Sequence, residues 1–169
     1  FHVTALHVAG EKNNIDIINL LFSHPEIQIV ENCFINCTKL IEITIPSSVT
    51  EIGNHAFDGC TSLSLITIPS SITKIGEYAF YKCVSLTQVT IPSSVTQICE
   101  CAFYRCSSIT EISLPSSITE IKMSTFRQCT SLQHVSIPSS VKSIEQGAFY
   151  ICTSLKDVII PSSVTTIGF

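Results

Sequence analysis

The chain has 169 residues, of which 45% are hydrophobic and 13% are charged, and its formal net charge is −4. This weak acidity argues against a nucleic-acid partner, which calls for a basic face. No apolar run reaches the ~18 residues of a transmembrane segment, and the length is sufficient for one domain with a buried core.

Two short helices are the first elements expected along the chain, within residues 1–28 (FHVTALHVAGEKNNIDIINLLFSHPEIQ). Apolar residues recur at helical spacing in IDIINLLF. The segment resembles one ankyrin repeat: residues 4–9 (TALHVA) stand where such repeats have T-P-L-H-x-A, although Gly10 departs from the usual Ala and Asn13-Asn14 from the usual glycine turn. One such repeat is not stable alone. We therefore predict that this ankyrin-like helix pair caps the structure that follows, covering Phe34 and Leu40.

From residue 29 onward the sequence repeats every 23 residues. The period is carried by a column of prolines and by parallel columns of phenylalanine, cysteine and leucine or isoleucine. The prolines are Pro46, Pro69, Pro92, Pro115, Pro138 and Pro161. Self-similarity at a fixed period of this length is the signature of a solenoid, in which each unit stacks on its neighbours.

Each repeat contains the same expected elements in the same order. The I-x-I step, as in residues 42–45 (EITI), has period two and predicts a strand, and the following proline ends it. The segment SSVTEI turns the chain and predicts a second short strand. GNHAFDGC at residues 53–60 predicts a helical turn with Ala-Phe pointing inward. Neighbouring coils should stack about 4.8 Å apart as parallel sheets.

The repeat LIEITIPSSVTEIGNHAFDGCTSL resembles the BspA-like leucine-rich repeat over residues 29–169, with five full units and a partial one at each end. This resemblance implies a right-handed α/β repeat solenoid with parallel β-sheets. It also implies a non-enzymatic surface antigen or adhesin, located at the cell surface or outside the cell, that binds host cells or extracellular-matrix proteins.

Nine cysteines raise the alternatives of disulfides, a metal site or buried thiols. Six of them share one column, and stacking at ~4.8 Å would hold their Cβ atoms too far apart for a bridge, so a ladder of buried thiols is expected. Cys101 falls where other repeats carry His55 and Tyr78 and is the thiol expected to be most exposed. The absence of a C-x-x-C pair argues against zinc. No phosphate loop, G-x-S-x-G or paired-carboxylate motif predicts an enzyme or a cofactor.

Candidate binding residues lie at the outward positions of the I-x-I strands, where side chains vary on a fixed scaffold. The alternative is that these are merely solvated strand positions. The surface suits modest-affinity contact with proteins or glycans. The more varied column is Glu42, Leu65, Gln88, Glu111, His134 and Asp157, and the more uniform one is Thr44, Thr67, Thr90, Ser113 and Ser136.

Two other functions stay open at this point. An intracellular scaffold is the alternative to the adhesin, because ankyrin repeats are commonest inside cells and a thiol ladder tolerates a cytoplasmic location. A structural array that spaces other domains is the third. The last residues, TTIGF, stop before their Ala-Phe turn. We therefore expect the chain to be a fragment of a longer protein, able to form an end-to-end homodimer.

Overall fold

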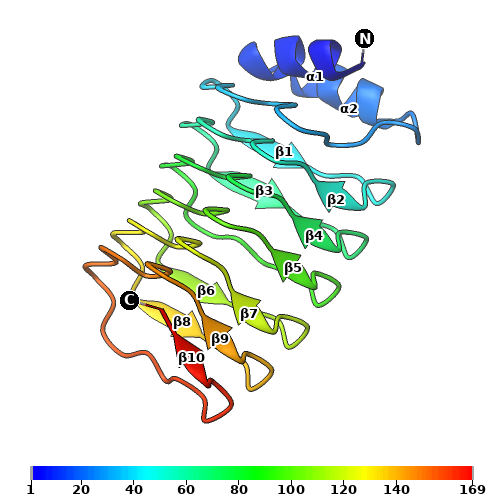
Figure 1. Ribbon diagram of the computed structural model, residues 1–169. Helices are drawn as coiled ribbons and strands as arrows, with labels where there is room; N and C mark the ends of the chain where they lie inside the picture. Colours follow the sequence, from blue (N-terminus) through cyan, green and yellow to red (C-terminus); the bar gives the residue numbers. More distant parts are fainter. Residues whose placement is uncertain (1, 169) are drawn as a thin grey trace.

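The computed structural model describes residues 2–168, which form a helix pair followed by a stack of parallel coils (Figure 1). Helix α1 spans His2–Glu11 and α2 spans Ile15–Phe22. Asn14 is the N-cap of α2, because its side-chain oxygen accepts a hydrogen bond from the Ile17 N–H at 3.1 Å. The two predicted helices are therefore confirmed.

Each coil contributes two short strands, which pair in parallel with the strands of neighbouring coils (Figure 1). The register is 23 residues throughout, as in the pairing of Glu42 with Leu65. The first strand position is occupied by β1 (Glu42–Thr44), β3 (Leu65–Thr67), β6 (Glu111–Ser113) and β8 (His134–Ser136). The second is occupied by β2 (Glu51–Ile52), β4 (Lys74–Ile75), β5 (Gln97–Ile98), β7 (Glu120–Ile121), β9 (Ser143–Ile144) and β10 (Thr166–Ile167).

The strand pairing is interrupted in the middle of the stack. β1 pairs with β3 and β6 with β8, but residues 88–90 between them form no strand. On the second side, β2, β4 and β5 form one sheet and β7, β9 and β10 another. The predicted parallel sheets are thus present, but each ladder is divided in two.

A third ladder holds the coils together where a helical turn was expected, and that expectation was wrong. Residues 54–59 form consecutive tight turns in which His55 has a φ of 53°. The N–H groups of His55, Phe57 and Gly59 each donate to a carbonyl of the next coil at 2.8 Å. Because alternate N–H groups point along the stack, they cannot form the internal hydrogen bonds of a helix. We call the equivalent segments 31–36, 54–59, 77–82, 100–105, 123–128 and 146–151 the turn ladder.

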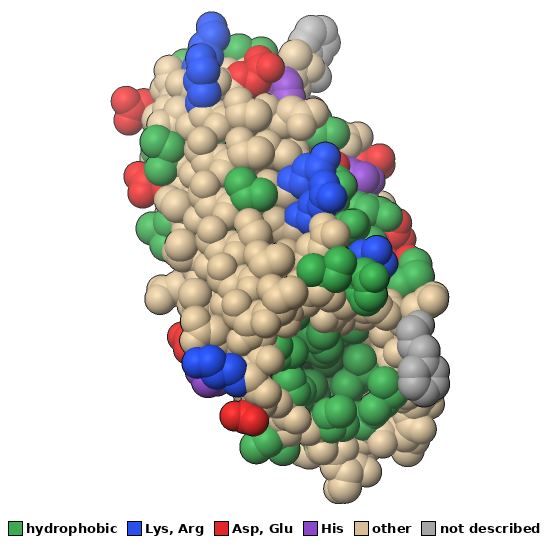
Figure 2. All heavy atoms as spheres, turned by 90° about the vertical axis from the view of Figure 1, so that its left-hand side faces the viewer, with side chains coloured by type: hydrophobic (Ala, Val, Ile, Leu, Met, Phe, Trp, Pro, Cys, Tyr) green, Lys and Arg blue, Asp and Glu red, His purple; other side chains and the backbone are tan. Residues whose placement is uncertain are grey.

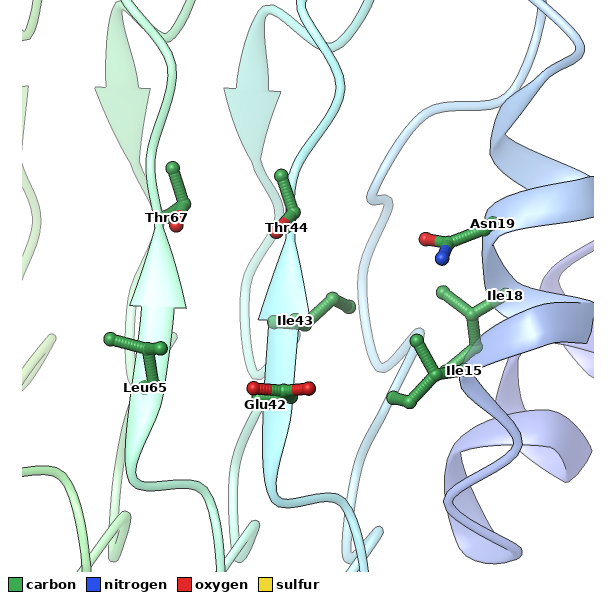
Figure 3. Close-up of a pocket in the computed structure, with 8 residues that line it drawn as sticks. All are labelled: Ile15, Ile18, Asn19, Glu42, Ile43, Thr44, Leu65 and Thr67. Carbon is green, nitrogen blue, oxygen red and sulfur yellow. The ribbon is translucent and has the colours of Figure 1, made fainter.

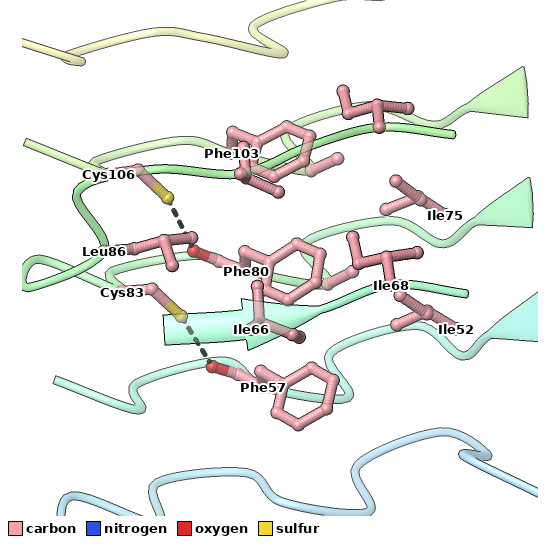
Figure 4. Packing of buried hydrophobic residues seen from close by; sticks show 14 of the residues in the cluster. Ile52, Phe57, Ile66, Ile68, Ile75, Phe80, Cys83, Leu86, Phe103 and Cys106 are labelled. Atoms are coloured by element: carbon pink, nitrogen blue, oxygen red, sulfur yellow. Dashed lines mark hydrogen bonds between the residues drawn. The ribbon is translucent and has the colours of Figure 1, made fainter. Parts of the chain in front are cut away.

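The core of the stack is a column of phenylalanines (Figure 4). Phe80 lies between Phe57 and Phe103, with ring centroids 5.3 and 5.2 Å away and nearly parallel ring planes. All three side chains are fully buried. The spacing of the rings follows the spacing of the coils, so each ring packs against the coils on both sides.

The predicted ladder of buried thiols runs beside these rings and is confirmed. All nine cysteines are buried and free. From Cys60 to Cys152, the thiol of this column donates to a phenylalanine carbonyl of the preceding coil, as Cys83 does to Phe57 at 3.2 Å and Cys106 to Phe80 at 3.1 Å (Figure 4). Burial raises the pKa of both thiols well above the ordinary value.

The expectation that Cys101 is exposed was wrong, since only 4% of the residue is accessible. Its thiol interacts with the Tyr78 hydroxyl of the preceding coil, and this interaction raises the pKa of Tyr78 to about 12. Burial raises the pKa of Cys101 itself. Tyr78 and Cys101 are one repeat apart and occupy the same column of the turn ladder.

The helix pair packs on the first coil through a close approach at Gly10. A Cβ atom on this residue would lie 2.7 Å from Phe34 Cδ1 and 2.8 Å from Cys37 Sγ, so the alanine usual in ankyrin repeats would not fit here. Phe22 contacts Phe34 edge-on, with ring centroids 6.5 Å apart. Phe34 and Leu40 are both fully buried. The helices thus take the place that a preceding coil occupies elsewhere in the stack.

At the opposite end, residues equivalent to the buried core are accessible. Leu155, Val158 and Val164 are only partly buried, whereas their counterparts in earlier coils are almost fully buried. Ile160 and Ile167 are each 48% exposed, whereas their counterparts Ile45 and Ile52 are buried. Figure 2 shows hydrophobic side chains gathered at this end of the stack. The core of each coil is therefore completed by the next one.

Candidate binding surface

The exposed side chains of the first strand position form a surface that we call the strand face. Every predicted binding residue lies on it and is exposed: Glu42, Thr44, Leu65, Thr67, Gln88, Thr90, Glu111, Ser113, His134, Ser136 and Asp157. Parallel pairing places equivalent residues of neighbouring coils side by side, and an isolated bridge extends the ladder from His134 to Asp157. Gln88 and Thr90 lie in the segment where the pairing is interrupted.

Two hollows mark the strand face. One, of about 210 Å³, lies where α2 meets β1 and β3 (Figure 3). Ile15, Ile18 and Asn19 of α2 form one wall, and residues of β1 and β3 form the other. The second hollow, of about 270 Å³, adjoins residues 88–91 together with Glu111 and Ser113.

Hydroxyl and carboxylate groups dominate the chemistry of the strand face. Glu42, Glu111 and Asp157 give it acidic character, and Leu65 adds an apolar contact with 53% of its surface exposed. The face can therefore form hydrogen bonds and ion pairs with a partner. Across residues 2–168, no cluster of three or more His, Cys, Asp or Glu side chains could hold a metal ion. Neither α1 nor α2 has the length and apolar character needed to cross a membrane.

A second surface, on the turn ladder, was missed from the sequence. All four tyrosines of the chain and both of its arginines lie there. We call it the tyrosine–arginine ridge; it comprises His55, Tyr78, Tyr81, Tyr104, Arg127 and Tyr150, flanked by Lys82 and Arg105. The available signal was the 23-residue spacing of Tyr81, Tyr104, Arg127 and Tyr150, but a helical turn was expected in this segment.

The ridge residues contact one another in an unbroken series. His55 stacks on Tyr78 with ring centroids 4.9 Å apart, and Tyr78 contacts Tyr81 edge-on at 5.6 Å. Tyr81 and Tyr104 are 5.1 Å apart. The Arg127 guanidinium carbon lies 5.7 Å from the Tyr104 ring centroid and 4.5 Å from that of Tyr150. The series therefore crosses five coils.

Three solved bacterial structures are similar to this chain. A leucine-rich repeat protein of T. pallidum is 37% identical with a TM-score of 0.81, over 84% of this chain and 66% of that one. A leucine-rich cell surface protein of Faecalibacterium prausnitzii is 40% identical with a TM-score of 0.78, over 83% and 38%. A leucine-rich repeat protein of Bacteroides ovatus is 32% identical with a TM-score of 0.73, over 84% and 43%. The chain thus spans just under two thirds of the first and less than half of the others.

The repeat pattern itself matches a known family. Residues 27–121 and 73–169 both match the BspA-type leucine-rich repeat region, in six copies. No curated protein matches the chain. The family match covers the whole stack of coils that carries the strand face and the tyrosine–arginine ridge. The chain therefore belongs to the BspA-type leucine-rich repeat family.

Proposed function

We propose that this chain is a non-enzymatic protein-interaction scaffold of a cell-surface antigen or adhesin, and that its strand face binds a host-cell or extracellular-matrix protein. The observation that carries this proposal is the fixed register of the strand face, which aligns varied, exposed side chains on a rigid ladder. The similarity to a cell surface protein of Faecalibacterium prausnitzii supports the proposed location.

The strand face suits a partner that is recognised by polar contacts over a wide area. Its hydroxyl and carboxylate groups are presented by backbone that the ladders hold in place, so little conformational entropy is lost on binding. The hollows beside α2 and at residues 88–91 offer positions for side chains of the partner. Adjacent coils would then act together, each adding a few contacts of modest strength.

Binding to immobilised fibronectin, laminin and collagen, measured by surface plasmon resonance, tests the proposal. The double variant Glu111→Ala/His134→Ala removes two neighbouring side chains of the strand face and should weaken binding about tenfold or more. The matched control Gln97→Ala/Lys142→Ala removes two exposed side chains elsewhere on the coils and should leave the affinity within about twofold. A lack of saturable binding to matrix proteins and to host cells, or equal losses in both variants, would refute it.

An intracellular scaffold is the second candidate, and the helix pair favours it. We propose that residues 1–28 are an ankyrin-like cap on the repeat domain of residues 29–169, and such repeats are commonest inside cells. Labelling of intact cells with a membrane-impermeant amine reagent distinguishes the two. Modified lysines support the surface location, and protection until lysis supports the intracellular one.

A further inference from the structure

The tyrosine–arginine ridge lies away from the strand face, at the edge of the stack formed by the turn ladder (Figure 1). Figure 2 shows cationic, histidine and hydrophobic side chains along this side of the molecule, with acidic side chains among them. Tyrosine and arginine are the residue types that, with tryptophan, most often dominate binding energy in protein interfaces. The chain has no tryptophan, and it places all its tyrosines and arginines here.

Arg127 is the centre of the ridge. Tyr104 and Tyr150 flank its guanidinium group, and the cation–π contacts with these two rings fix the plane of the group. Its Nε atom is buried and has no hydrogen-bond partner among residues 2–168. A guanidinium held in this way presents a planar set of N–H donors, and that geometry matches a carboxylate.

Among the described residues, Lys82, Arg105 and Arg127 also lack acidic partners, whereas His55 of the ridge lies 2.9 Å from an Asp58 carboxylate oxygen. Lys82 and Arg105 lie over the rings of Tyr81 and Tyr104, at 4.9 and 5.7 Å from the centroids. Three positive charges are therefore held in place on a molecule whose net charge is −4.

A hollow of about 290 Å³ opens beside Arg127, lined also by Met123, Gln146 and Tyr150. It exists because the side chains in one column of the turn ladder become smaller along the stack after Tyr78: Cys101, Ser124 and Gly147. Gly147 has no side chain, so the space that corresponds to the one filled by Tyr78 three coils earlier stays open. The hollow can hold one side chain of a partner.

The ridge residues share their backbone conformation with the equivalent residues of the other coils. His55, Tyr78, Lys82 and Arg105 all have φ between 53° and 64°, a region that L-residues with large side chains seldom adopt. At equivalent positions the first coils use Asn32, Asn36 and Gly59, which tolerate this conformation better. The same φ recurs at Cys101, Ser124, Gln128 and Ile151, so this conformation belongs to the turn ladder of every coil.

We propose that the ridge binds an acidic segment of a partner protein, with one Asp or Glu carboxylate entering the hollow beside Arg127. Lys82 and Arg105 attract the flanking acidic residues, and the tyrosine rings contact their side-chain carbons. A single flanked guanidinium and a hollow of side-chain size suit a peptide. A sulfated polysaccharide would instead require a denser row of cations than three on an acidic protein. This surface is independent of the proposed strand-face function.

Fluorescence anisotropy with a labelled peptide of alternating Glu and Gly tests the proposal, with the Gln-Gly peptide as its neutral counterpart. The Glu peptide should bind saturably and more weakly as salt rises, and the Gln peptide should not bind. Arg127→Gln should weaken binding about tenfold or more. Arg127→Lys should also weaken it severalfold, because lysine keeps the charge but loses the planar donors.

Gly147→Tyr is the decisive variant, because it fills the hollow and keeps every charge. Tyr78 has a φ of 53° at the equivalent position, and a Cβ atom on Gly147 would lie 3.4 Å or more from its neighbours, so the chain should accept the substitution. Unchanged circular dichroism checks the fold. The expected result is a loss of peptide affinity similar to that of Arg127→Gln, while the control Lys142→Gln stays within about twofold of the parent.

Several results would overturn the proposal. These are the absence of saturable binding to the Glu peptide, an equal loss in Lys142→Gln, or unchanged binding in a folded Gly147→Tyr. Heparin binding that persists in Gly147→Tyr, without peptide binding, would identify a polysaccharide site instead. The strand-face variant Glu111→Ala/His134→Ala should bind the Glu peptide normally, so the proposals for the ridge and for the strand face can be refuted separately.

Discussion

Replacing Phe80 with alanine should destabilise the protein by about 4–5 kcal/mol, near the upper end of core phenylalanine truncations. The side chain is fully buried, so its removal leaves a cavity that the flanking coils cannot close without breaking their ladder bonds. It also removes two ring contacts, at 5.3 and 5.2 Å, each worth about 0.5–1.5 kcal/mol beyond area burial. Phe149 is the matched site, because it occupies the same column but is partly buried and contacts one ring, at 5.6 Å.

Urea unfolding followed by circular dichroism measures both variants. Phe149→Ala should cost about 2 kcal/mol, roughly half the loss at Phe80. Phe80→Leu, which keeps most of the volume but no ring contact, should fall between the parent and Phe80→Ala. Domains of this size are stable by about 5–15 kcal/mol, so Phe80→Ala should remain measurable. Equal losses at the two phenylalanines would refute the reasoning that two-sided packing between coils stabilises the stack.

The remaining predictions concern the thiols, a close backbone contact and the helix pair. Unfolded thiols ionise near pH 8.5 whereas buried ones stay neutral, so the free energy of unfolding, measured in urea, should fall above that pH by ~1.4 kcal/mol per pH unit for each thiol. Cys83→Ala/Cys106→Ala should make the fall of this free energy with pH less steep, and an unchanged pH dependence would contradict the prediction. Gly76→Ala should cost about 1–3 kcal/mol in the same assay, since its Cβ would lie 2.7 Å from the Asn54 backbone nitrogen; an unaltered midpoint would exclude the clash. Deleting residues 1–28 should lower the melting temperature by exposing Phe34, and an unchanged value would show that the helices are not a cap.

The repeat columns made most of the fold predictable. Period-two strands, the proline stops and the inward phenylalanines each follow from local chemistry that the sequence repeats six times. The turn ladder could not be predicted in the same way, because its hydrogen bonds join residues one coil apart and its left-handed residues include His55 and Tyr78, which give no such signal. Cys101 was misplaced for the same reason, since it lies in the turn ladder.

The two surfaces differ in how far they could be predicted. Strand-face residues alternate with buried ones along each strand, so their outward direction follows from sequence position alone. The hollow beside Arg127 depends on the diminishing side chains that end at Gly147 and on rings from two other coils. Such a site can be identified only when the stacking of the turns is known.

The constant 23-residue register has a consequence at the level of the gene. Each ladder residue pairs with the residue one repeat later, so removing or duplicating one whole repeat leaves every remaining residue with an equivalent partner. Recombination between the near-identical segments that encode the proline turns would therefore lengthen or shorten the array without a packing defect. It would also place different strand-face and ridge side chains next to one another, so that new binding surfaces arise while the same core is kept.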